Sequence, residues 1–125
     1  MNKLILPIVV LYKKNLIQAE SINTLLDSDV TGLIGDIYVY DNTPGEEKNF
    51  SSNQNEYRGR NIIYVHNPEN AGVSRAYNSG LKIAKQLGYK FVLILDQDTH
   101  FPIESLRVYT RAIDDYPNIK IYVPS

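Results

Sequence analysis

Short apolar runs recur along the chain, and most of them are rich in β-branched and aromatic residues. Runs of this length and composition, set off by polar or turn-forming residues, are typical of strands. A polar stretch separates two of the runs and predicts a long loop over residues 43–60. The pattern predicts five strands, over residues 4–11, 36–40, 61–66, 89–95 and 119–123.

Three segments between these runs carry apolar residues at helical spacing, and they predict helices over residues 15–28, 73–87 and 102–115. Asn15 followed by Gln18 resembles a capping box at the start of the first helix. Gly88 is a typical stop signal for the second helix. Small residues also recur every fourth position along that helix, which predicts close packing on the sheet. This stripe, with a mainly structural role, consists of Gly72, Ala76, Gly80, Ala84 and Gly88.

Strands that alternate with helices indicate an α/β fold with a mostly parallel sheet. Right-handed crossovers then place helices on both faces of that sheet. In such sheets, ligands bind beyond the carboxyl ends of the strands. The fold therefore predicts a site built from residues 11–13, 41–42, 66–67 and 96–98.

The composition narrows the classes of function. The chain has 125 residues, which suffices for one compact domain, and a formal net charge of −1. This charge gives no strong field toward nucleic acid or an anionic membrane, so we expect neither as a partner. There is no cysteine, which excludes disulfides and thiolate metal sites and suits a reducing compartment. Residues 4–11 are far shorter than the roughly 20 residues of a membrane span, so we expect a cytoplasmic protein.

Asp96 and Asp98 follow an apolar run, with one residue between them. In an extended segment, residues i and i+2 point the same way, so the two carboxylates would converge. Two carboxylates about 4 Å apart repel by roughly 4 kcal/mol at an effective dielectric near 20. A hard divalent cation reverses the sign of this interaction. The pair therefore predicts an Mg²⁺ or Mn²⁺ site whose shell is completed by water and substrate phosphates.

Two other interpretations of this segment stay open. In the first, Asp96 and Asp98 lie in a solvated turn and cap the next helix. In the second, the DxDxT pattern belongs to a phosphatase of the haloacid-dehalogenase type, with Asp96 as nucleophile. Such phosphatases carry the motif after their first strand and need further motifs downstream, whereas only residues 101–125 follow His100 here.

The stretch NPENAGVSRAYNSGLKIAKQLGYKFVLILDQD, residues 67–98, joins the acidic motif to the helix before it. Asn70-x-Gly72-x-x-x-Ala76-x-Asn78-x-Gly80 leads there to an apolar strand and DxD. Together with IVVLY near the start and IYVYDNTP in the middle, this order resembles the family 2 glycosyltransferases of the GT-A fold, and bacterial rhamnosyltransferase-type members most. The resemblance covers essentially the whole chain. It implies a Rossmann-like half of a GT-A fold that binds a nucleotide-diphosphate sugar through the metal, for inverting sugar transfer in bacterial surface polysaccharide synthesis.

The resemblance also implies roles for single residues. Asp41 would bind the nucleotide base, since an acceptor-only carboxylate matches the N–H groups of uracil, thymine or guanine. Asp98 would bind the metal, and Asp96 the metal or the ribose. The family often has Asn where this chain has Lys13. The remaining nucleotide contacts would come from Leu11, Tyr12, Asn70, Gly72 and Arg75.

Plain structural interpretations stand beside three of these roles. Asp41 and Asn42 are also a turn-forming pair. Tyr12 suits an aromatic that fills the edge of the core, and Arg75 suits a solvated surface position.

In the family, the half that follows the donor site supplies the acceptor site and the catalytic base, usually a carboxylate. The resemblance thus implies that residues 1–125 are a single nucleotide-sugar-binding domain, truncated before that half and inactive alone. The complete enzyme would take a sugar or lipid-linked acceptor and could be membrane-peripheral. A second hypothesis, from another class, is a degenerate assembly module without catalysis. Such a module would self-associate as a homo-oligomer through an uncovered sheet edge.

Overall fold

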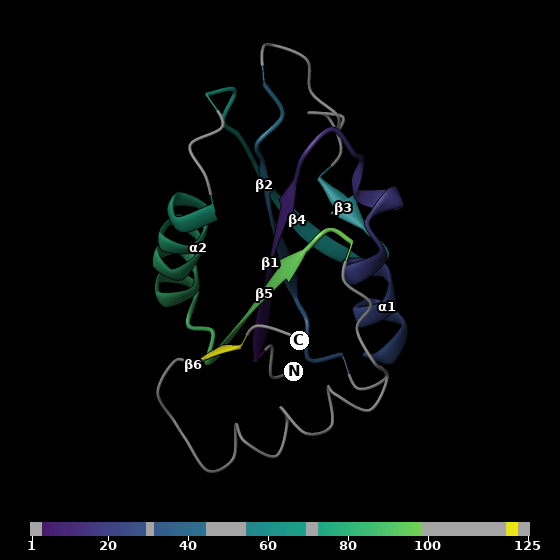
Figure 1. The fold of residues 1–125 in the computed structure, drawn as a ribbon. Helices are drawn as coiled ribbons and strands as arrows, with labels where there is room; N and C mark the ends of the chain where they lie inside the picture. The colour runs from purple at the N-terminus through teal and green to yellow at the C-terminus, as the bar shows by residue number, and fades with distance from the viewer. Residues whose placement is uncertain (1–3, 30–31, 45–54, 70–72, 99–119, 123–125) are drawn as a thin grey trace.

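The computed structural model describes residues 4–29, 32–44, 55–69, 73–98 and 120–122 (Figure 1). The strands are β1 (Ile5–Leu11), β2 (Asp36–Asp41), β3 (Glu56–Tyr57), β4 (Arg60–His66), β5 (Phe91–Asp96) and β6 (Lys120–Tyr122). They form a six-stranded sheet in the order β3-β4-β2-β1-β5-β6. Neighbouring strands are parallel except for the antiparallel pair of β3 and β4.

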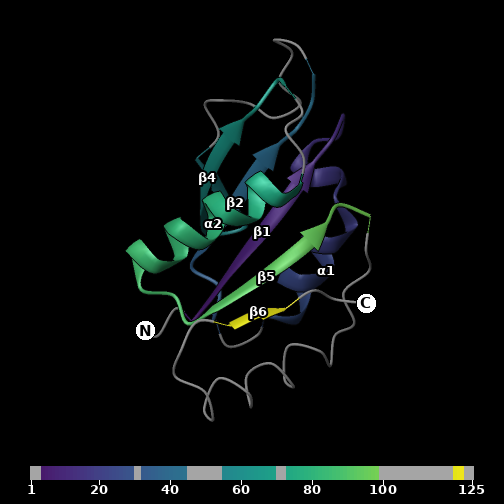
Figure 2. The same cartoon turned by 60° about the vertical axis from the view of Figure 1, so that its left-hand side comes forward.

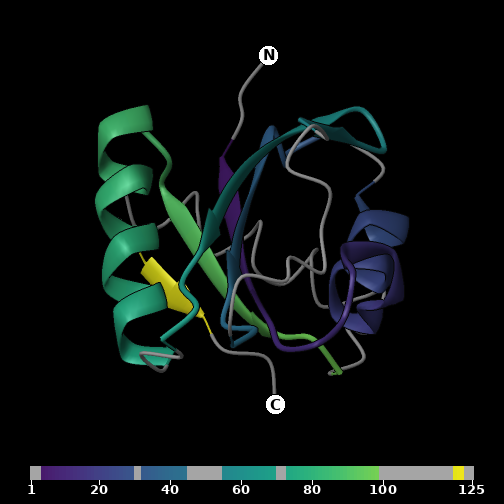
Figure 3. The ribbon, with the colours of Figure 1, turned by 90° about the horizontal axis from the view of Figure 1, so that it is seen from above.

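Helices α1 (Glu20–Ser28) and α2 (Val73–Leu87) lie on opposite faces of this sheet (Figures 1 and 3). Each helix packs its buried residues against the side chains of one face, so that the core has two separate apolar layers. The predicted α/β fold, with a mostly parallel sheet and helices on both faces, is therefore confirmed.

Strand β1 lies in the middle of the described sheet, between β2 and β5. Its residues Ile5, Leu6, Ile8 and Val9 are fully buried, so both faces of the strand are covered. Complete burial of one such side chain contributes about 1.5–3 kcal/mol. Burial on both faces explains why this segment is a continuous apolar run rather than an alternating one.

Helix α2 comes unusually close to the sheet at Gly80. A Cβ built on Gly80 would lie 2.3 Å from Cδ1 and 2.7 Å from Cγ1 of Ile8 in β1. Ala76 and Ala84, one turn to either side, are fully buried. The close packing predicted from the small-residue stripe is confirmed for these three positions, whereas Gly72 lies outside the described residues.

Helix α2 ends at the predicted glycine. Gly88 has a φ of 81°, in the left-handed region that favours glycine. Its N–H donates to the carbonyl of Lys85 at 3.3 Å, and the N–H of Tyr89 donates to the carbonyl of Ala84 at 2.9 Å. This pair of bonds is a Schellman motif, which satisfies carbonyls that the helix end leaves free.

The single helix predicted over residues 15–28 is wrong in one respect, because the structure divides it. A 3₁₀ turn covers Leu16–Gln18, and α1 begins only at Glu20. The side chain of Gln18 accepts the N–H of Asn15 at 2.9 Å, so the predicted capping pair closes the short turn instead of a long helix. Between the two, the buried Ala19 has extended backbone, with ψ at 108°.

The prediction of an uninterrupted loop over residues 43–60 is also wrong, because β3 lies within it. Arg58 and Gly59 join β3 to β4, and both have positive φ, 49° and 81°. A two-residue turn with this backbone matches the right-handed twist of a hairpin, which explains the antiparallel pairing. The helix predicted over residues 102–115 lies outside the described residues, and part of the last predicted strand forms β6.

Candidate functional site

The carboxyl ends of β1, β2, β4 and β5 meet at one edge of the sheet, because these strands run in the same direction (Figure 2). The segments that follow them are linked to one another by backbone bonds. The N–H of Asn42 donates to the carbonyl of Leu11, and the N–H of Asn67 donates to that of Asp41, both at 2.8 Å. The polar segments singled out from the sequence are thus brought together.

Three consecutive residues after β1 are each bonded to the end of another strand. The N–H of Tyr12 donates to Oε1 of Gln97 at 2.9 Å, and Nε2 of Gln97 donates back to the carbonyl of Tyr12 at 3.2 Å. The N–H of Lys13 donates to Oγ1 of Thr43 at 2.9 Å. The ammonium group of Lys14 lies 2.5 Å from Oδ1 of Asp98. We call residues 12–14 the β1 loop; it bridges the ends of β2 and β5.

The acidic motif lies partly outside its strand. β5 ends at Asp96, and Gln97 and Asp98 form a turn. The prediction that Asp96 and Asp98 point the same way rested on both lying in an extended segment. This premise is wrong, because Asp98 lies in the turn. The carbonyl of Gln97 accepts the N–H of Ser21, in the first turn of α1, at 3.3 Å. The turn is held by both the β1 loop and α1, and both aspartates are exposed.

Asp41 at the end of β2 is fully buried, and both of its carboxylate oxygens accept hydrogen bonds. Oδ1 accepts from the N–H of Thr43 at 3.0 Å and from its hydroxyl at 2.5 Å, and Oδ2 accepts from the hydroxyl of Tyr64 at 2.7 Å. Burial raises the pKa of Tyr64, and the hydrogen bond and charge of Asp41 raise it further. The bond to the N–H two residues later is the side-chain turn expected of an Asp-Asn pair. The predicted role of Asp41, to bind the nucleotide base, stays a prediction.

Two buried side-chain atoms of the described residues lack a hydrogen-bond partner, and both lie near this edge. One is Oδ1 of Asn42, directly after β2; the other is Oγ of Ser21, whose N–H donates to Gln97. A buried polar atom without a partner costs about 1–3 kcal/mol.

The other residues predicted to contact the nucleotide differ in how exposed their side chains are. The side chain of Leu11 is fully buried in the core layer on the α1 side, so it offers a ligand its backbone only. Tyr12 is 42% exposed, and the ammonium group of Lys13 lies 5.3 Å from the centre of its ring. Arg75 is exposed in the first turn of α2. Asn70 and Gly72 lie outside the described residues.

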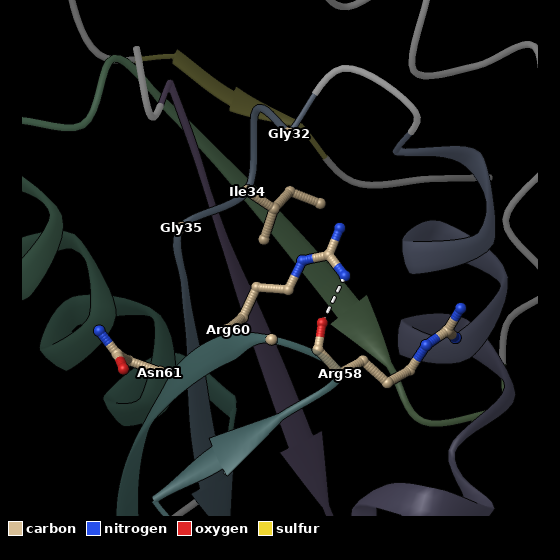
Figure 4. A pocket seen from close by; sticks show the side chains of 7 residues that line it. Gly32, Ile34, Gly35, Arg58, Arg60 and Asn61 are labelled. Atoms are coloured by element: carbon tan, nitrogen blue, oxygen red, sulfur yellow. Dashed lines mark hydrogen bonds between the residues drawn. The ribbon is translucent and has the colours of Figure 1, made fainter. Parts of the chain in front are cut away.

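A separate pocket lies at the opposite edge of the sheet, between the segment before β2 and the β3–β4 hairpin (Figure 4). Its two arginines are engaged with the protein. Arg60 pairs with the fully buried carboxylate of Asp29 at 2.9 Å, and Arg58 pairs with Asp27 at 2.6 Å. These contacts hold the hairpin against α1 and the segment that follows it, so this pocket is a poor candidate for the site.

Comparison with models of known families shows to which family the chain belongs. The family model described as glycosyl transferase family 2 matches residues 8–123. The chain belongs to glycosyl transferase family 2. Comparisons with curated proteins and with solved structures gave no match.

Membership of the family supports a glycosyltransferase-like domain. Members of family 2 bind a nucleotide-sugar donor and an acceptor in general, and the α/β architecture of the described residues is consistent with a Rossmann-like half of a GT-A fold. None of its described helices is both long enough and apolar enough to cross a membrane. Sequence reasoning missed Lys14 and Thr43, and it included Gln97 in the site without its contacts, because the partners of these residues lie 30 to 85 residues away and no local pattern marks them.

Proposed function

We propose that the carboxyl edge binds a nucleotide-diphosphate sugar through Mg²⁺ or Mn²⁺ at Asp96 and Asp98, as part of an inverting glycosyltransferase of bacterial surface polysaccharide synthesis. Within the family, the resemblance of residues 67–98 favours a rhamnosyltransferase-like member. The observation that carries the proposal is the position of two exposed carboxylates at the end of β5, on a turn fixed by Gln97.

The donor set fits such an ion. Asp96 and Asp98 offer hard, anionic oxygen ligands, which suit Mg²⁺ and Mn²⁺. The described residues gather no cluster of three or more acidic, histidine or cysteine side chains that would enclose a metal. Mg²⁺ typically takes only one or two carboxylates and fills its shell with water and phosphate oxygens. When bound, the ion would neutralise the charge that develops on the departing diphosphate.

The neighbouring segments supply groups for the rest of the donor. The exposed ring of Tyr12 offers a face for the base. Asp41, and the unpartnered amide oxygen of Asn42 beside it, offer acceptors for its N–H groups. Asp41 is fully buried, so its use by the base requires that the groups covering it move; its carboxylate accepts three hydrogen bonds and can accept one more.

Calorimetric titration tests the proposal. UDP, dTDP and GDP are titrated with and without Mn²⁺, and we expect at least one to bind only with the metal. Asp98→Ala should abolish this metal dependence. Asp27→Ala is the matched control, because Asp27 is also exposed and paired with a cation but lies beside the hairpin at the opposite edge.

The outcomes separate the hypotheses. Folded wild-type protein that binds none of the three nucleotides in the presence of Mn²⁺ would refute the proposal. Metal-dependent binding that survives Asp98→Ala would show that Asp98 is not a metal ligand. Self-association in light scattering, together with no nucleotide binding, would favour the assembly module. Hydrolysis of a generic aryl phosphate that depends on Asp96 would instead support the phosphatase.

A further inference from the structure

The ion pair between Lys14 and Asp98 bears on the order in which the metal and the diphosphate bind at the site. Nζ of Lys14 lies 2.5 Å from Oδ1 of Asp98, so a positive charge is already at the carboxylate proposed to receive the metal. The two residues are 84 apart in sequence, and their side chains are 40% and 65% exposed. Both are therefore accessible to ions and ligands.

The position of Lys14 is set by its neighbours in the β1 loop. Tyr12 is bonded twice to the side chain of Gln97, which precedes Asp98 in the turn. Lys13 has a φ of 55° and donates its N–H to Thr43. The backbone on both sides of the ion pair is thus fixed, and Lys14 reaches Asp98 from an anchored loop.

Building on the proposed function, we infer that Lys14 competes with the divalent cation for Asp98 and, once displaced, binds the donor diphosphate. An ammonium group beside the carboxylate repels a second cation, so Lys14 has to leave before Asp98 becomes a full metal ligand. A lysine released at this edge is then a point charge near the phosphates, a use for which lysine is well suited. The charge on Asp98 is balanced before and after donor binding.

This exchange predicts opposite effects of one substitution on two ligands. Lys14→Met removes the competitor and should tighten binding of Mn²⁺ alone by about two- to fivefold, the range expected for an exposed ion pair. The same variant should weaken binding of the nucleoside diphosphate at saturating Mn²⁺ by about tenfold, since a charged donor is lost. A purely structural role for Lys14 would not tighten metal binding.

The experiment measures Mn²⁺ binding by calorimetry and by electron paramagnetic resonance of the free ion, followed by titration with UDP, dTDP and GDP. Lys85→Met is the matched control, because it removes the same charge from an exposed residue in the last turn of α2, which precedes the start of β5 and not its end. It should leave both affinities within about twofold of wild type. Lys14→Arg keeps the charge and should retain the competition.

Each outcome has a definite consequence. Tighter Mn²⁺ binding and weaker diphosphate binding in Lys14→Met, but not in Lys85→Met, support the exchange. Equal Mn²⁺ affinities in both Met variants, or undiminished diphosphate binding by Lys14→Met, overturn the exchange while leaving the proposed function intact. Failure of wild type and all variants to bind either ligand overturns both.

Discussion

Replacing Gly80 by alanine tests how closely α2 packs on the central strand. The added methyl group would lie 2.3 Å from Cδ1 and 2.7 Å from Cγ1 of Ile8. Ile8 is fully buried between its neighbours, so its side chain has little room to move away. The substitution therefore forces either an unfavourable side-chain conformation in β1 or a shift of α2 away from the sheet.

Two effects of opposite sign determine the change in stability. Alanine is better than glycine inside a helix by about 1 kcal/mol. An extra methyl group in a well-packed core costs about 1–3 kcal/mol, and the short separations at Gly80 favour the upper part of that range. We therefore expect Gly80→Ala to lower the free energy of unfolding by about 1–2 kcal/mol.

Urea unfolding followed by circular dichroism measures the effect, and Ile8→Val provides a double-mutant cycle. This second change removes Cδ1, the nearer contact atom, at a cost of about 0.5–1.5 kcal/mol by itself. In the double variant, the cost of Gly80→Ala should fall by about 0.5–1 kcal/mol, because part of the overlap is gone.

Gly88→Ala is the matched control for this cycle. Gly88 follows the same helix and has open space around its Cα, but its φ of 81° disfavours other residues. Its substitution should cost about 1 kcal/mol through the backbone, unchanged by Ile8→Val. A stabilising Gly80→Ala, or a cost that is the same in both backgrounds, would refute the close approach as the reason for the glycine.

Two further predictions concern buried polar groups. Arg60→Met should lower the free energy of unfolding by about 3 kcal/mol, because it leaves the fully buried carboxylate of Asp29 without its cation. Arg58→Met, at an exposed pair, should cost less than about 1 kcal/mol; equal losses in urea unfolding would contradict this difference. Burial and hydrogen bonds to carboxylates raise the pKa of Tyr64 and Tyr89 above the ordinary 10.0. The native chain then holds protons that the unfolded chain releases, so stability should be fully retained below about pH 10 and should fall as the pH rises above it. Urea unfolding across this window checks the sign, and a free energy that stays constant there would contradict it.

The elements with a strong local pattern were predictable from the sequence. β1 and β5 are buried on both faces, which requires apolar residues at nearly every position, and Gly88 marks its helix end by a backbone that other residues disfavour. β3 was missed because its two residues, Glu56 and Tyr57, are too few to show alternation. The break at Ala19 was missed because alanine is itself a good helix former, and the contact that holds the start of α1 comes from Gln97.

The candidate site was predictable as a location but not as a set of contacts. The rule for parallel sheets gathers the strand ends at one edge whatever their side chains are. Whether Asp41 is open to a ligand or buried and bonded to Thr43 and Tyr64 depends on packing between separate strands. The same holds for the pairing of Gln97 with Tyr12, which no spacing along the chain reveals.

The left-handed backbone of Lys13 has a consequence for how this loop tolerates sequence change. At a φ of 55°, glycine and asparagine are comfortable, whereas valine, isoleucine and threonine are strained. An asparagine in place of Lys13 would therefore preserve the path of the chain although it removes the charge. A loop graft intended to alter donor preference should therefore keep a residue that tolerates this backbone at position 13, since a β-branched residue there would strain the segment that carries Tyr12 and Lys14.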